Sequence, residues 1–165
     1  MKKFAFVLLV LSISVTAAKA SCSLESSRPW AGFKIEAVAS GPDCAKAVVT
    51  LIIRNSSGGA LWSHSYVASE LMSFSQSPNA DDKAMLGLLK DWISGEGFMK
   101  SADKLVMDGE FAFDLGEGTD AATFAKFRKS KLPLFCYIQG MESGNCLAKS
   151  QDGSLIELGL QRFPG

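Results

Sequence analysis

The sequence predicts an α+β fold made of two antiparallel β-meanders, with one main amphipathic helix and one short helix packed on the sheet and disulfides as staples. Runs of strand-like residues in each half of the chain predict the meanders, because alternate side chains of a strand point to opposite faces. A segment with helical spacing of apolar residues separates the two runs. Four cysteines supply the staples.

The first meander comprises three expected strands, at residues 30–40, 45–54 and 60–68. The first of them alternates between apolar and polar side chains, which is typical of a half-buried strand. The second is apolar on both faces and rich in β-branched residues, so we expect it to be central in the sheet. The polar residues 21–29 are expected to form an irregular lead-in.

The main helix is predicted to begin at Ser77-Pro78 and to end at Gly95, since proline favours the first helical turn and glycine the position after the last. Its apolar side chains follow the i, i+3, i+4, i+7 pattern, at Met85, Leu88, Leu89 and Trp92. Residues 96–109 fit neither period.

A short strand is expected at residues 110–115, with Phe111, Phe113 and Leu115 on one face. The short helix follows at residues 120–129, with Thr119 as its cap.

The second meander again has three expected strands, at residues 132–139, 145–149 and 154–162. Turn residues separate them, with Ser143-Gly144 before the middle strand and Asp152-Gly153 before the last. None of the boundaries along the chain has the composition of a linker. The expectation is therefore one exported α+β domain over residues 21–165.

Residues 1–20 have the features of a cleaved secretory signal peptide: a positive start, an apolar run and small residues at Ala18 and Ala20. The run is shorter than the ~20 residues that span a membrane, so no transmembrane span is expected after cleavage. Lipidation at Cys22 is an alternative, but Lys19 and Ser21 do not match a lipidation motif. The short Lys-rich start is typical of bacteria, which predicts a periplasmic or secreted protein.

All four cysteines lie in the exported part, at Cys22, Cys44, Cys136 and Cys146. An even number of cysteines in an exported chain indicates two disulfides. Four cysteines allow three connectivities, and proximity favours the pairs 22–44 and 136–146. A zinc site of four thiolates is the alternative, but the chain has no C-x-x-C pair.

Charge and motifs exclude several classes of function. Lys plus Arg and Asp plus Glu are both 17, which leaves no basic footprint for a nucleic-acid partner. Residues 116–121 match the G-x-G-x-x-A pattern of dinucleotide-binding folds, but Asp114, Glu117 and Asp120 would repel phosphate. The same three acids could hold Ca²⁺, although the EF-hand pattern is absent. We therefore expect a strand-to-helix turn with acidic capping, and neither a cofactor nor a metal.

The candidate binding residues are Trp62, His64 and Tyr66, which share one face of the strand at residues 60–68 and are called the aromatic stripe below. His64 is the only histidine in the sequence, so a Ser–His or Cys–His catalyst would depend on it. An exposed stripe would mark a binding surface, and a buried one would belong to the core. Leu61 and Val67 occupy the opposite face, so the orientation stays open.

The residues favour a non-catalytic exported, periplasmic module that binds another protein or an envelope component, in an inhibitor-like or accessory role. The chain shows no recognisable catalytic set, and the aromatic stripe supplies a candidate contact face. A small envelope hydrolase that relies on His64 is one alternative. A structural subunit of an envelope assembly is another.

Overall fold

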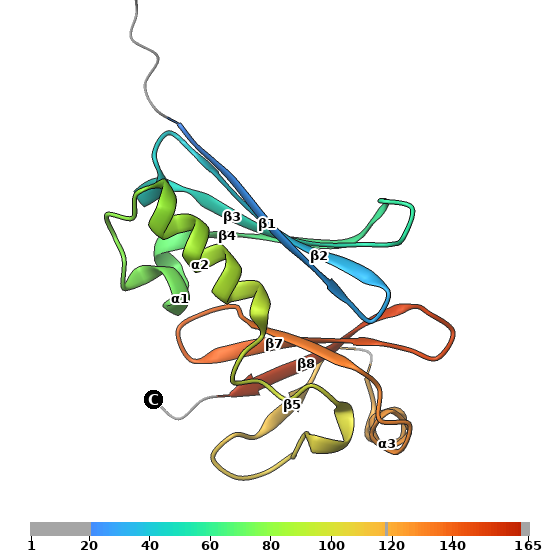
Figure 1. The fold of residues 1–165 in the computed structure, drawn as a ribbon. Coiled ribbons are helices and arrows are strands. Elements are labelled where there is room, and N and C mark those ends of the chain that lie inside the picture. Colours follow the sequence, from blue (N-terminus) through green and yellow to red (C-terminus); the bar gives the residue numbers. More distant parts are fainter. Residues whose placement is uncertain (1–20, 118, 163–165) are drawn as a thin grey trace, which may run out of the picture.

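The computed structural model describes residues 21–117 and 119–162. These residues form two four-stranded antiparallel sheets with three α-helices, which confirms the predicted α+β fold (Figure 1). The expected signal peptide falls on residues 1–20 and lies outside the described residues. No helix within the described ranges is both long and apolar enough to cross a membrane.

Sheet 1 has the order β1-β2-β3-β4, so each strand pairs with its neighbour in the sequence. Its strands are β1 (Cys22–Trp30), β2 (Phe33–Gly41), β3 (Val48–Arg54) and β4 (Ala60–Val67). The inner face of the sheet is buried, with Ile35, Leu51 and Ile53 fully enclosed. The outer face stays open to solvent, and Val48 on that face is 42% exposed. Strand β3 is thus interior in the sheet, as predicted, but is covered on only one face.

Strand β1 corrects the expectation that residues 21–29 are an irregular lead-in. Its inward positions are occupied by Cys22, Leu24, Ser26, Arg28 and Trp30, so two polar residues interrupt the apolar alternation. A strand with such a mixed face gives little periodic signal. The tight turn after Trp30 then reverses the chain into β2.

Sheet 2 has the order β5-β8-β7-β6. Its strands are β5 (Phe113–Leu115), β6 (Leu134–Ile138), β7 (Ser143–Lys149) and β8 (Leu155–Arg162). The last three form the predicted second meander, and β5 pairs with β8 at its edge. The expectation of a strand over residues 110–115 was too long, because pairing with β8 begins at Phe113 and leaves Phe111 48% exposed.

The helices are α1 (Met72–Ser75), α2 (Asp82–Ser94) and α3 (Ala121–Lys129). Helix α2 begins later than predicted, because Asp81 is its cap and accepts a hydrogen bond from the Ala84 amide at 2.8 Å. Helix α3 is capped by Asp120 in place of Thr119, through the Thr123 amide at 2.6 Å. The acidic capping expected at this turn is therefore confirmed.

Two apolar clusters divide the interior. The first lies between the inner face of sheet 1, helix α2 and one face of sheet 2, from which Phe135, Tyr137 and Leu147 contribute. The second cluster lies on the other face of sheet 2 and includes Phe124 of α3. Sheet 2 is therefore a middle layer, as Figure 1 shows, with sheet 1 and α2 on one side of it and α3 on the other.

Both disulfides favoured by proximity are present, Cys22–Cys44 and Cys136–Cys146. The first joins the start of β1 to the short helical turn that precedes β3. The second links directly opposite residues of β6 and β7. All four cysteines are therefore joined in the two pairs that proximity favoured.

Candidate binding site at the edge of sheet 1

The aromatic stripe lies on β4, which is an edge strand of sheet 1. The register pairs its members with buried residues of β3: Trp62 with Ile53, His64 with Leu51 and Tyr66 with Val49. The stripe therefore belongs to the inner face of the sheet. Trp62 and Tyr66 are half-buried against the first apolar cluster, whereas His64 is exposed. The stripe is thus part core and part surface, at the place where the inner face of sheet 1 reaches solvent.

Ring contacts hold the stripe in order. The His64 imidazole stacks on the Tyr66 ring, with centroids 4.6 Å apart and planes 13° from parallel. The Trp62 ring centroid lies 6.1 Å from that of His64. In the part of the chain that the structure describes, the His64 imidazole has no hydrogen-bond or ion-pair partner. Its imidazole nitrogens are therefore open to a ligand.

A chain of hydrogen bonds ties both ends of the stripe to sheet 2. The hydroxyls of Tyr66 and Tyr137 lie 2.8 Å apart. The Asn145 amide donates to the Tyr137 hydroxyl at 3.3 Å and to the Glu157 carboxylate at 2.5 Å. The same carboxylate accepts from the Trp62 indole nitrogen at 3.3 Å. Trp62 and Tyr66 consequently have fixed positions before any ligand arrives.

The electrostatics of this chain keep both phenols neutral. Burial raises the pKa of Tyr137 and of Tyr66, and the nearby Glu157 carboxylate adds to the increase for both. Each hydroxyl therefore keeps its proton and remains a hydrogen-bond donor as well as an acceptor.

A cavity of about 380 Å³ adjoins the hydrogen-bond chain. It is lined by two glycines, Gly116 and Gly159, by Leu160 and by four polar side chains, Glu117, Gln139, Asn145 and Glu157. Asn145 is 2% exposed, and its Oδ1 has no hydrogen-bond partner among the residues described. A buried acceptor left unpaired costs roughly 1–3 kcal/mol, which a ligand that donates to it would recover.

Two residues of the G-x-G-x-x-A match, Gly116 and Glu117, line this cavity. The acids of the calcium alternative are engaged separately. Asp114 accepts a two-point hydrogen bond from Arg162 at 2.5 Å, and Asp120 caps α3. Within the described ranges, no three His, Cys, Asp or Glu side chains gather as metal ligands. The disulfide cysteines lie apart from the cavity lining.

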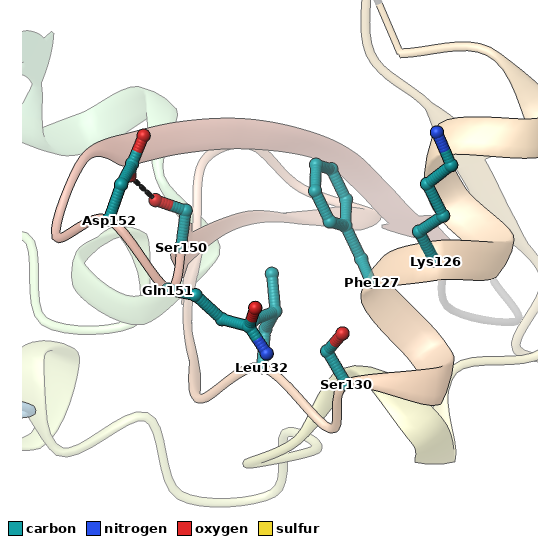
Figure 2. Close-up of a pocket in the computed structure, with 7 residues that line it drawn as sticks. All are labelled: Lys126, Phe127, Ser130, Leu132, Ser150, Gln151 and Asp152. Atoms are coloured by element: carbon teal, nitrogen blue, oxygen red, sulfur yellow. Dashed lines mark hydrogen bonds between the residues drawn. The ribbon is translucent and has the colours of Figure 1, made fainter.

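A second cavity, of about 440 Å³, lies between α3 and the turn that joins β7 to β8 (Figure 2). Phe127 and Leu132 form its apolar part, and Ser150 and Asp152 lie across from them. The hydroxyl of Ser150 donates to the Asp152 carboxylate, and hydrogen bonds from Ser150 and Ser154 lower the pKa of Asp152 to about 2. These polar groups are hydrogen-bonded to one another and therefore offer little to a ligand. This cavity is the weaker candidate site.

Tyr137, Asn145 and Glu157 were missed by sequence reasoning, although they hold the stripe in place. All three lie in the second meander, and only the packing of the two sheets brings them to β4. One signal was available, since Asn145 is a polar residue next to the apolar run that follows it in β7. Comparisons with protein-family models, with curated proteins and with solved structures find no match. The site is therefore interpreted from its geometry.

Proposed function

We propose that this protein is a non-catalytic exported module that binds another protein or an envelope component, in an inhibitor-like or accessory role. The aromatic stripe is the proposed contact face. One observation carries the proposal: two half-buried rings, Trp62 and Tyr66, flank an exposed imidazole and are joined by hydrogen bonds to side chains that line a cavity. Such a site combines apolar contact area with a few fixed polar groups, as binding sites usually do.

The stripe is suited to binding because it is ordered in advance. Aromatic side chains bring a large contact area and lose little conformational entropy when they are already held in place. Hydrogen bonds fix Trp62 to Glu157 and Tyr66 to Tyr137. A partner that covers the stripe would therefore lose little affinity to side-chain ordering.

The proposed compartment is the periplasm or the secreted fraction. Two disulfides are compatible with an oxidising, exported environment. The signal peptide expected at residues 1–20 supports the same proposal from the sequence.

The contacts of His64 support binding over hydrolysis. A nucleophilic catalyst needs its base within hydrogen-bond reach of a nucleophile, with a third group to orient that base. The contacts made by His64 in the described residues are ring contacts with Trp62 and Tyr66. We therefore assign the imidazole to ligand contact.

Affinity capture from an envelope extract tests the proposal. The bait is the protein produced from the full sequence in an oxidising compartment, compared with a His64→Ala variant and a Trp62→Ala/Tyr66→Ala variant. The matched control is Leu61→Ala, which truncates an exposed side chain of the same strand that is not part of the aromatic stripe. We expect one partner to be retained by the wild type and by Leu61→Ala, and to be lost or strongly reduced with the stripe variants.

Folding is checked by thermal melting of every bait, since Trp62 and Tyr66 also contact the core. A partner that binds all folded variants equally would place the contact face elsewhere. Turnover in a broad hydrolase screen that disappears in His64→Ala would replace the binding proposal with catalysis.

A further inference from the structure

The free edge of β4 carries backbone groups without partners. The amide of Ala68 donates to the carbonyl of Ala47 at 3.0 Å, and the register pairs Val67 with Val48. Hydrogen-bonded and non-hydrogen-bonded pairs alternate along an antiparallel ladder. Trp62, His64 and Tyr66 therefore direct their backbone groups to β3. The amides and carbonyls of Ser63, Ser65 and Val67 point the other way.

These outward groups are unpaired in the described part of the chain, where no backbone hydrogen bond joins residues 61–67 to anything outside the β3–β4 ladder. The ladder is regular from Trp62 to Val67 and is interrupted by a bulge next to Leu61. Both serines and His64 are exposed. Strand β4 is therefore open to pairing with another strand.

The other sheet edges are protected in ways that β4 is not. Strand β1 carries Glu25, Arg28 and Pro29, and charges and proline both discourage edge pairing. The edge of β6 is partly covered, because the Leu134 amide donates to the Lys100 carbonyl at 2.9 Å. Strand β5 is only three residues long. Strand β4 has neither a charged residue nor a proline.

The sequence of β4 is nearly the same in both directions. Residues 61–67 read Leu-Trp-Ser-His-Ser-Tyr-Val, so aliphatic, aromatic and serine positions mirror one another around His64. A strand of this kind is self-complementary when it pairs antiparallel with a second copy about a two-fold axis.

We propose that this protein forms a homodimer in which the β4 strands of two copies pair antiparallel, with the two-fold axis at His64. Ser63 of each copy then lies opposite Ser65 of the other, in the hydrogen-bonded positions that the outward backbone groups require. Trp62 lies opposite Tyr66. Aromatic pairs and serine pairs of this kind stabilise neighbouring strands.

The dimer joins the two copies of sheet 1 into one continuous sheet. The aromatic stripes of both copies then lie side by side on the same face, because residues directly opposite in a sheet share a face. This inference does not rest on the proposed binding function.

Cysteine cross-linking tests the register. In the proposed dimer the His64 residues of the two copies face each other as a non-hydrogen-bonded pair. The Cα atoms of such a pair lie about 4.5 Å apart, within the range that a disulfide accepts. The Ser63 residues of the two copies are offset by two positions along the paired strands. Their Cα atoms therefore lie farther apart than the roughly 7 Å limit for a disulfide. With oxidised glutathione as the oxidant, we expect His64→Cys to give a covalent dimer on a non-reducing gel and Ser63→Cys to stay largely uncross-linked. Equal cross-linking of both variants overturns the proposed register.

Proline substitution tests whether the free edge of β4 forms the dimer. The Ser65 amide points away from β3, so Ser65→Pro removes an intermolecular donor from each copy and leaves the β3–β4 ladder intact. We expect the dimer dissociation constant, measured by sedimentation equilibrium, to rise about tenfold or more for Ser65→Pro. The control Ser65→Ala keeps the amide and loses only the serine hydroxyl, so the dissociation constant should rise much less than for Ser65→Pro.

Two results would overturn the dimer itself: a wild-type protein that is monomeric at its highest soluble concentration, or a dimer unchanged by Ser65→Pro. Ser65→Pro and Ser65→Ala are also used as baits in the affinity capture described above. Ser65→Pro retains all three side chains of the stripe. If this variant no longer self-associates but still captures the partner, both proposals stand. Loss of capture in His64→Ala with an intact dimer would support the binding face and leave self-association standing.

Discussion

Glu36 is a carboxylate on the outer face of sheet 1 that is nearly enclosed by its own neighbours. Its side chain is 8% exposed, with the Lys34 ammonium and the Arg54 guanidinium each 2.5 Å from one of its oxygens. Burial by itself would raise the pKa of Glu36, but the hydrogen bonds and charges of Lys34 and Arg54 outweigh burial, so the pKa is lowered. The ionised form is therefore favoured in the folded state.

This arrangement predicts a pH-dependent effect of Glu36→Gln. A lowered folded-state pKa contributes stability above the ordinary value of 4.5, and that stability is lost as the pH falls through the lowered pKa. We expect Glu36→Gln to reduce the free energy of unfolding by about 1–2 kcal/mol at pH 7, and the difference to narrow in acid. Urea unfolding at pH 7 and pH 3 measures both quantities.

Glu25→Gln is the matched control, because Glu25 lies 3.9 Å from the Lys34 ammonium and is 57% exposed. An exposed ion pair of this kind contributes about 0–1 kcal/mol at most. A Glu36→Gln variant as stable as the wild type at pH 7 would contradict the ion-pair interpretation.

At the scale of the element, α2 has one glycine within it and a second directly after its last residue, with opposite roles. Gly95 ends the helix in the left-handed region, with φ of 59°, and a Cβ built there would lie 3.0 Å from the Cys136 carbonyl oxygen. Gly87 lies in the middle of the helix, and a Cβ there would meet nothing within 4 Å. One position therefore requires glycine, and the other does not.

We expect Gly95→Ala to lower the free energy of unfolding by about 1 kcal/mol or more, through strain and the close carbonyl contact. Gly87→Ala should raise it by about 0.5–1 kcal/mol, because alanine loses less entropy in a helix. Urea denaturation of the two variants beside the wild type gives both values. Shifts of the same sign would mean that the helix end is not as described.

Elements with an unbroken apolar period could be predicted from the sequence, and those without one could not. Helix α2 was found because Met85, Leu89 and Trp92 have helical spacing, and all three are buried. Strand β1 was missed because Ser26 and Arg28 interrupt its inward face. The Arg28 guanidinium donates a hydrogen bond to the Ile93 carbonyl at the end of α2. This tertiary contact has no signature in the sequence.

The candidate site was predictable only in its local part. The spacing of Trp62, His64 and Tyr66 placed them on one face of a strand, and the register confirms that placement. Which way the face points depends on how sheet 2 packs beneath it. The partners Asn145 and Glu157 lie more than seventy positions along the chain, at separations where periodicity carries no information.

At the scale of the whole molecule, the two sheets share one apolar cluster. The Trp30 indole of β1 donates to the Leu134 carbonyl of β6 at 3.1 Å, and the hydroxyls of Tyr66 and Tyr137 meet between β4 and β6. Phe135 of sheet 2 packs in the same cluster as the inner face of sheet 1. Neither sheet can open without exposing surface that belongs to the other.

We therefore expect the protein to unfold in a single cooperative transition, as a single domain would. All three tryptophans, Trp30, Trp62 and Trp92, contact residues of sheet 2, so their fluorescence reports on the shared cluster. Far-ultraviolet circular dichroism reports on both sheets. Coincident urea transitions by the two probes would support one unit, whereas two separate midpoints would divide the chain into two.

The order of strands also has a consequence for how the chain acquires its structure. Sheet 1 is built from consecutive hairpins, whereas β5 finds its partner β8 only after α3, β6 and β7 have been made. Contacts between near neighbours form faster than contacts across long loops, because less loop entropy is lost. Pairing within sheet 1 should therefore precede the pairing of β5 with β8 as the chain folds.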